Sequence, residues 1–75
     1  MIPQSRLPID REARILSLSA EEPLQSRLMD LGFVPGSPIR PLYAAPLGDP
    51  RAYLICETVI ALRQRDAATV AVEEA

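Results

Sequence analysis

The chain contains no histidine, no lysine and no tryptophan, and it has a single cysteine, Cys56, among its 75 residues. Without histidine, a Ser-His-Asp triad, a histidine general base and a zinc finger with histidine ligands are all excluded. One cysteine cannot form an internal disulfide, and residues 1–4 lack the basic and then apolar pattern of a secretion signal. The absence of histidine therefore excludes most enzyme templates. The single cysteine and the lack of a secretion signal predict a reducing cytoplasm as the compartment.

Positive charge is also limited. All eight basic residues are arginine, and ten acidic residues leave a net charge of -2. Since no basic stripe is present to neutralise a phosphate backbone, the sequence predicts no nucleic-acid partner. No apolar run approaches the roughly 20 residues that cross a bilayer. We therefore expect no direct membrane insertion, and any link to a membrane must be made through a partner protein.

A chain of 75 residues has room for one domain, and a domain of this size buries only about 60% of the surface of its unfolded chain. Residues 1–12 carry Pro3 and Pro8 and show no hydrophobic period, which predicts an N-terminal arm that is still able to cap the fold. The domain itself is predicted over residues 13–75.

A strand and then a helix are predicted in the first half of the domain. The short, partly β-branched run Ala13–Leu18 predicts a strand, although its leucines and alanine leave a helix open. The helix start has two candidates, a capping box of Ser19 with Glu22 and a proline, Pro23, at the first helical position. One apolar stripe is expected on this helix, formed by Leu24, Leu28 and Leu31.

Consecutive residues specify the end of this helix and the turn after it. Gly32 suits the left-handed position after the last turn, and Phe33 would then contact Leu28, as in a Schellman ending. Residues 34–37 predict a type II turn, because proline presets the first central residue and glycine accepts positive φ at the second. The chain is thereby turned sharply into a strand.

Four more short strands are predicted in the second half, at residues 39–44, Tyr53 with Ile55, Ile60 with Leu62, and Val70 with Val72. Pro41 makes the first of them an edge strand or a bulged one. Glu57 and Thr58 are expected to form a tight hairpin turn, and residues 64–68 favour one helical turn. Five short strands with one helix after the first hide both edges best by curling into a small barrel. The predicted fold class is mostly β.

Few residues are candidates for chemistry. The ten carboxylates show no spacing that converges on a cleft, which favours solvated charges. Cys56 with Glu57 and a remote carboxylate would make a weak metal site, since soft sites usually need several Cys or His. A cysteine with no chemical role is a more common situation than a metal ligand or a nucleophile, and it is the favoured interpretation of Cys56.

An apolar residue on a proline-flanked loop is the stronger candidate. Leu47 lies between Pro46 and Gly48. It either anchors another protein from a conformationally restricted loop, or folds back to close one end of the barrel. The arginines expected at the rim of such an interface are Arg27, Arg40 and Arg51.

Three motifs together resemble one known family. They are residues 27–37 (Arg-Leu-Met-Asp-Leu-Gly-Phe-Val-Pro-Gly-Ser), residues 45–50 (Ala-Pro-Leu-Gly-Asp-Pro) and residues 60–63 (Ile-Ala-Leu-Arg). Their order and spacing resemble the ferrous iron transport protein A (FeoA) family, roughly from Ala13 to Glu73. The resemblance implies an SH3-like β-barrel of about five strands with one α-helix inserted after the first strand. This agrees with the layout predicted from the residues.

The resemblance also implies a function. The chain would be a small cytoplasmic accessory of ferrous iron uptake, without catalysis or a cofactor of its own, held at the inner face of the membrane through its partner. That partner would be a FeoB-type ferrous iron transporter, whose cytoplasmic GTP-binding region the chain would bind and modulate. The predicted partner-binding residues are Arg27, Asp30, Pro46, Leu47, Gly48, Asp49 and Pro50.

The chain departs from the family pattern at several positions. Glu57 stands where a hairpin glycine is usual, Arg51 where an apolar residue is usual, and Pro41 in a strand that is generally unbroken. The expected core positions remain apolar, so these departures bear on partner specificity more than on the fold.

Alternatives stay open. Similar domains occur at the C-terminus of metal-dependent repressors of the diphtheria toxin repressor type, where they contact the rest of the same protein. Direct binding of a transition metal is a second alternative, with Cys56 as the testable ligand and the other ligands unknown. A module for Pro-rich peptides needs an aromatic groove, and the only aromatics are Phe33, Tyr43 and Tyr53. Weak self-association is also left open.

Overall fold

The computed structural model describes residues 1–74. Its elements in chain order are β1 (Ile2–Pro3), a 3-10 helix η1 (Gln4–Arg6), β2 (Ala13–Leu18), α1 (Leu24–Asp30), β3 (Pro38–Ala44), β4 (Arg51–Ile55), β5 (Thr58–Leu62), α2 (Gln64–Ala67) and β6 (Val70–Glu74). Each strand predicted from the sequence is present, as are the helix after the first of them and the single turn before the last.

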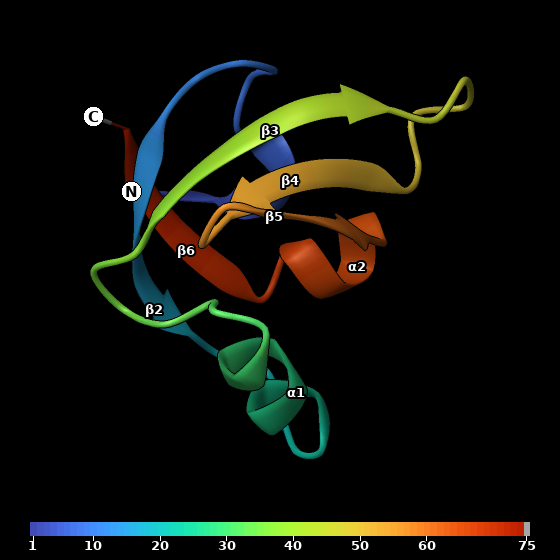
Figure 1. The fold of residues 1–75 in the computed structure, drawn as a ribbon. Coiled ribbons are helices and arrows are strands. Elements are labelled where there is room, and N and C mark those ends of the chain that lie inside the picture. Colours follow the sequence, from blue (N-terminus) through green and yellow to red (C-terminus); the bar gives the residue numbers. More distant parts are fainter. Residues whose placement is uncertain (75) are drawn as a thin grey trace.

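All six strands form one antiparallel, strongly curved sheet (Figure 1) in the order β1-β6-β2-β3-β4-β5. The strand beyond the predicted five is β1, which the N-terminal arm supplies by pairing Ile2 with Val72 and Pro3 with Ala71. The expectation that closure hides both edges is not met, because no strand within residues 1–74 pairs with the outer side of β5.

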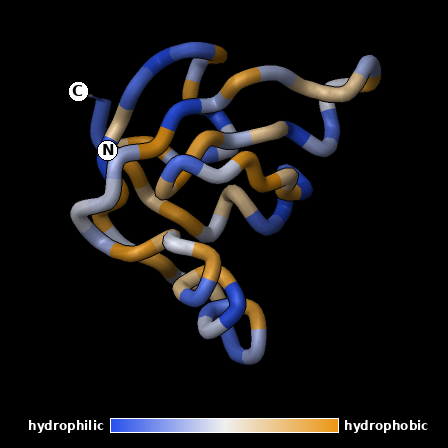
Figure 2. The backbone as a smooth tube through the Cα atoms, viewed as in Figure 1, coloured by the Kyte–Doolittle hydropathy of each residue, from blue (hydrophilic) through white to orange (hydrophobic). Residues whose placement is uncertain are grey.

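Residues 1–12 pack onto the rest of the chain. Leu7 has no exposed surface and belongs to the core cluster, together with Ile15 of β2 and Tyr53 of β4. Hydrophobic segments recur along the strands that enclose this core (Figure 2). Whether the chain divides at residue 12 into an arm and an independently folding domain stays a prediction.

Helix α1 begins at Leu24, with Pro23 at the N-cap. The predicted capping box is wrong, since the Ser19 hydroxyl donates to the carbonyl of Thr69 on another segment. The Glu22 carboxylate instead accepts hydrogen bonds from the backbone N–H and the hydroxyl of Ser26, at 2.7 and 2.5 Å. A side chain just before the helix therefore satisfies one of the free N–H groups of the first turn.

The predicted Schellman ending of α1 is confirmed. Gly32 has a φ of 109°, the N–H of Phe33 donates to the carbonyl of Leu28 at 2.9 Å, and the N–H of Gly32 donates to that of Met29 at 3.0 Å. The predicted apolar stripe is only partly correct, because Leu31 is 41% exposed whereas Leu28 is fully buried. The reversal of the chain at Gly32 directs Phe33, rather than Leu31, into the core.

The turn after α1 is of type II, as predicted. The N–H of Ser37 donates to the carbonyl of Val34 at 3.1 Å, and Gly36 has a φ of 92°. In β3, the register shifts between Pro41 and Tyr43, so this proline lies at a bulge, one of its two predicted settings, in a strand that is internal to the sheet.

The hairpin between β4 and β5 turns one residue earlier than predicted. Ile55 pairs with Thr58, so the two turn residues are Cys56 and Glu57, with φ values of 49° and 61°. Positive φ at both central residues is the geometry of a type I′ turn, whose twist matches that of the flanking strands. Glycine and asparagine usually occupy such positions, and because neither is present here, the residue types do not indicate where the turn lies.

Candidate functional site

The loop between β3 and β4, residues 45–50, places its apolar residue in solvent. Leu47 is 97% exposed, which excludes the alternative that it folds back to close the barrel. The loop is internally bonded: the N–H of Gly48 donates to the carbonyl of Ala45 at 2.7 Å, and the N–H of Ala45 donates to the carbonyl of Pro50 at 2.9 Å. The leucine therefore projects from a closed turn.

Helix α2 ties this loop to the body of the protein. The Asp49 carboxylate accepts a hydrogen bond from the backbone N–H of Gln64 at 2.9 Å, and the Gln64 side-chain amide donates to the carbonyl of Gly48, also at 2.9 Å. Asp49 thus satisfies a free N–H at the beginning of α2. Gly48 and Asp49, predicted as partner-binding residues, use these groups to hold the loop.

Tyr43 adds a second exposed apolar group near the same end of the sheet. It precedes the loop by two residues and is 61% exposed. In the sequence, Tyr43 was named only among the aromatics that a groove for Pro-rich peptides would need. The exposed apolar surface at this end of the protein therefore includes Tyr43 as well as Leu47.

Two predicted site residues lie elsewhere. Arg27 and Asp30 are exposed on α1, which lies at the opposite end of the molecule from the β3–β4 loop (Figure 1). The predicted partner-binding residues therefore belong to two separate surfaces.

The sequence predicted Arg51 at the rim of an interface, and this prediction is wrong. Its side chain is 8% exposed, and its guanidinium donates to the carbonyl of Ser5 at 2.6 Å and to the carbonyl of Leu7. It also lies 5.4 Å from the centroid of the Tyr53 ring, within the range of a cation–π contact. Burial raises the pKa of Tyr53, and the nearby Arg51 charge opposes this shift. The unusual arginine therefore fastens the N-terminal arm to β4.

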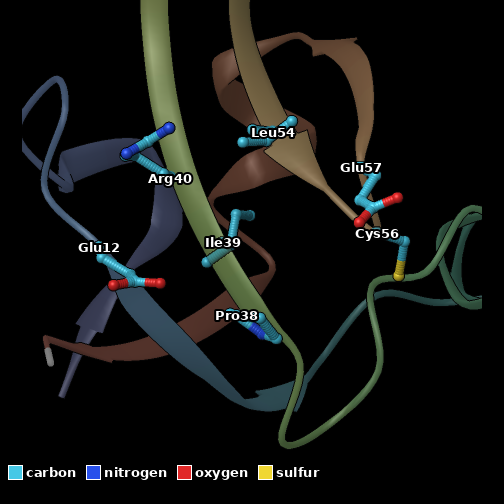
Figure 3. Close-up of a pocket in the computed structure, with 7 residues that line it drawn as sticks. All are labelled: Glu12, Pro38, Ile39, Arg40, Leu54, Cys56 and Glu57. Carbon is cyan, nitrogen blue, oxygen red and sulfur yellow. The ribbon is translucent and has the colours of Figure 1, made fainter.

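A pocket of about 290 Å³ (Figure 3) is lined by residues of β3, β4 and the turn after β4, with one residue before β2: Glu12, Pro38, Ile39, Arg40, Leu54, Cys56 and Glu57. Within residues 1–74, no three His, Cys, Asp or Glu side chains are grouped so as to hold a metal ion. The thiol of Cys56 is exposed and packs close to the backbone of Gly32, where an added Cβ would lie 2.8 Å from the sulfur.

Among the helices of residues 1–74, none has the length and apolar composition of a membrane span.

The model of the FeoA domain matches residues 3–74 of the chain. The chain belongs to the FeoA family. This match begins ten residues before Ala13, the start predicted from the motifs, and so includes most of the N-terminal arm. FeoA domains belong to ferrous iron transport and are not a known enzyme family.

Individual relatives agree with this assignment. An Fe(2+) transport protein A/Fe(2+) transporter FeoB fusion protein of Porphyromonas gingivalis is 35% identical over 69 residues, covering 92% of this FeoA chain but only 8% of the fusion protein. Iron(II) transport protein A from Clostridium thermocellum is 40% identical with a TM-score of 0.93, covering 97% of this chain and 45% of that one. FeoA from Stenotrophomonas maltophilia, solved with zinc and described as an SH3 domain protein, is 31% identical with a TM-score of 0.85, over 97% and 91% of the two chains. The fold of this FeoA chain is SH3-like.

Proposed function

We propose that this FeoA chain is an accessory protein of ferrous iron uptake that docks on the cytoplasmic GTP-binding region of a FeoB-type transporter and modulates it. The exposed Leu47 on its tethered loop is the observation that carries the proposal. An apolar side chain with 97% of its surface in water contributes nothing to the core, whereas its transfer into a partner's pocket is favourable by about 1.5–3 kcal/mol.

The bonding of the loop supports its use as an anchor. Its own turn and the contacts of Asp49 and Gln64 hold Leu47 in place before any partner arrives. Binding then immobilises few additional groups, which reduces the entropic cost of association. Tyr43 widens the apolar contact, and aromatic residues are enriched at the centres of interfaces.

The fusion relative supports the choice of partner. In the Porphyromonas gingivalis protein, a region similar to this chain and a FeoB transporter are parts of one polypeptide. Joining two modules raises their effective concentration, which is useful where the two act on each other. Where the two are not joined, affinity takes the place of this proximity, and an exposed anchor contributes to affinity.

Modulation requires the docked chain to distinguish between states of the transporter. A ligand shifts a conformational equilibrium only by its difference in affinity for the two states. We therefore propose that the pocket for Leu47 differs between the GTP-bound and GDP-bound forms. Arg27 and Asp30 form a second proposed contact. A partner reaches it only if it extends from the β3–β4 loop around the sheet to α1.

The test is a titration of labelled FeoA with the transporter's cytoplasmic domain in its GTP and GDP forms. Leu47→Ala is expected to weaken binding about 10- to 100-fold, the range that corresponds to losing the burial of one leucine. Asp49→Ala keeps the leucine but removes the bond to the N–H of Gln64, so it should weaken binding by a smaller factor through a looser loop. Leu16→Ala is the matched control, because it truncates another partly exposed leucine that lies on β2, outside both proposed contacts.

Equal binding by Leu47→Ala and the parent chain would reject the loop as the anchor. Absence of binding to either nucleotide form would reject docking itself, and equal affinity for both forms would reject modulation by this mechanism. Loss of binding in the Leu16→Ala control would show that the loss in Leu47→Ala is not specific to the loop.

A further inference from the structure

Strand β5 is an open sheet edge. The other end of the sheet is β1, which has two residues, one of them Pro3, and is thus too short to accept another strand. In contrast, β5 has five residues, Thr58–Leu62, which pair with β4 without a register shift. It contains no proline and no charged side chain, the features with which proteins usually protect an edge from pairing.

The hairpin register determines which backbone groups of β5 are free. Because the turn has two residues, Ile55 and Thr58 form a hydrogen-bonded pair, and such pairs alternate along an antiparallel ladder. Thr58, Ile60 and Leu62 therefore direct their backbone groups towards β4. The N–H and C=O groups of Val59 and Ala61 point to the outer side, where residues 1–74 provide no pairing strand.

The residues of β5 that have free backbone groups also have exposed side chains. Val59 is 51% exposed, and Thr58 and Ala61 are also exposed. An exposed segment of β-branched and small residues has high strand propensity and little cost in desolvated charge. The edge is thus accessible both for hydrogen bonding and for apolar contact.

We propose that β5 pairs antiparallel with β5 of a second copy of this chain, about a two-fold axis at Ile60. In this register Val59 lies opposite Ala61 of the second copy, so both pairs use free edge groups and together form four N–H···O bonds. The interface is isologous, as expected for a two-fold dimer.

Charge selects this register over its neighbours. Glu57 and Arg63 immediately flank β5, and both are exposed. With the axis at Ile60, Glu57 of each copy lies opposite Arg63 of the other, giving two complementary pairs. A register with Val59 opposite Val59 places Glu57 opposite Ala61, and one with Ala61 opposite Ala61 places Arg63 opposite Val59, so that each leaves charges without a counterpart.

One strand pair buries less surface than the roughly 1,200 Å² of a stable interface, so the dimer is weak. Sedimentation equilibrium of the full chain between about 10 μM and 1 mM measures it over the range expected of such interfaces. Amide hydrogen exchange locates the contact, since rising protein concentration should slow exchange at Val59 and Ala61 but leave Thr58 and Ile60, already bonded to β4, unchanged.

Charge reversal provides the decisive comparison. Glu57→Arg alone and Arg63→Glu alone each place like charges opposite each other at both ends, and each should weaken the dimer about tenfold, as two exposed pairs change sign. The double variant should restore the parent affinity to within about threefold, by the same reasoning. Glu21→Arg is the matched control, because it makes the same charge change at an exposed site before α1.

A chain that stays monomeric throughout the range would overturn the proposal, as would a dimer that the single charge variants do not weaken. Protection of Val59 and Ala61 only on addition of the transporter's cytoplasmic domain would show that a partner's strand occupies the edge, and would equally overturn self-pairing. Leu47→Ala should leave the dimer unchanged, so its result for transporter docking is independent of this one.

Discussion

Replacing Arg51 with methionine should release the N-terminal arm and lower the free energy of unfolding by a large fraction. The guanidinium is a buried link between β4 and the arm, through the carbonyls of Ser5 and Leu7. Methionine keeps an apolar stem of similar length but removes the charged donors and the cation–π contact with Tyr53. The variant therefore tests the guanidinium group rather than the packing of the stem.

Two hydrogen bonds from a charged donor are worth about 1.5–3 kcal/mol each, or about 3–6 kcal/mol together. Part of this is offset, because the Nε atom of Arg51 is buried without a partner and its desolvation already costs stability in the parent chain. We expect a net loss of about 2–4 kcal/mol, compared with roughly 4–11 kcal/mol for the whole stability of a domain of this size. The variant should fold, but marginally.

Urea unfolding measures the loss, and amide hydrogen exchange locates it. With a slope of about 1 kcal/mol/M for so small a protein, the midpoint should fall by roughly 2 M or more. The amides of β6 that pair with β1 should lose protection first. Arg65→Met is the matched control, because Arg65 is exposed on α2. A loss below about 1 kcal/mol, within the range of an exposed ion pair, or an arm that stays protected, would refute the role of Arg51.

Two further substitutions test the ends of α1. Gly32→Ala should cost about 1–3 kcal/mol, because Gly32 has a φ of 109° and the new Cβ would lie 2.8 Å from the Cys56 sulfur; a urea midpoint equal to that of the parent would contradict this. Ser26→Ala should raise the pKa of Glu22, which the Ser26 hydroxyl and then its backbone N–H hold below the ordinary value. Since a depressed carboxyl pKa stabilises the fold above the unfolded-state pKa and this stabilisation is lost as pH falls through the folded-state pKa, the variant should also show a weaker acid dependence of stability. An NMR titration of the Glu22 carboxyl gives the shift directly, and an unchanged pKa would count against the proposed bonds.

Features set by adjacent residues were predictable from the sequence. The Schellman ending at Gly32, the type II turn at residues 34–37 and the bulge at Pro41 each depend on the backbone freedom of one residue and its immediate neighbours. The strand positions followed from local alternation and turn spacing. The hairpin turn was misplaced by one residue because Cys56 and Glu57 adopt positive φ without being the residues that usually favour it.

Of the candidate site, sequence reasoning identified the loop, and the structure determined how the loop is presented. A proline-flanked Leu47 is visible in the sequence, but its exposure depends on whether the rest of the fold leaves a space for it. The hydrogen bond between Asp49 and Gln64 joins residues 15 positions apart. Their pairing could not be read from either segment alone, and the same holds for the separation of Arg27 and Asp30 from the loop.

By itself, therefore, the sequence determined the local conformations, the order of the elements and the family, because these depend on short-range sterics and on motifs of contiguous residues. Tertiary structure alone decided that Arg51 holds the arm, that Leu47 points into water and that β5 remains an open edge. Each of these outcomes depends on which distant backbone groups meet and which are left unpaired, and burial and hydrogen bonding between remote segments settle that only when the whole chain has folded.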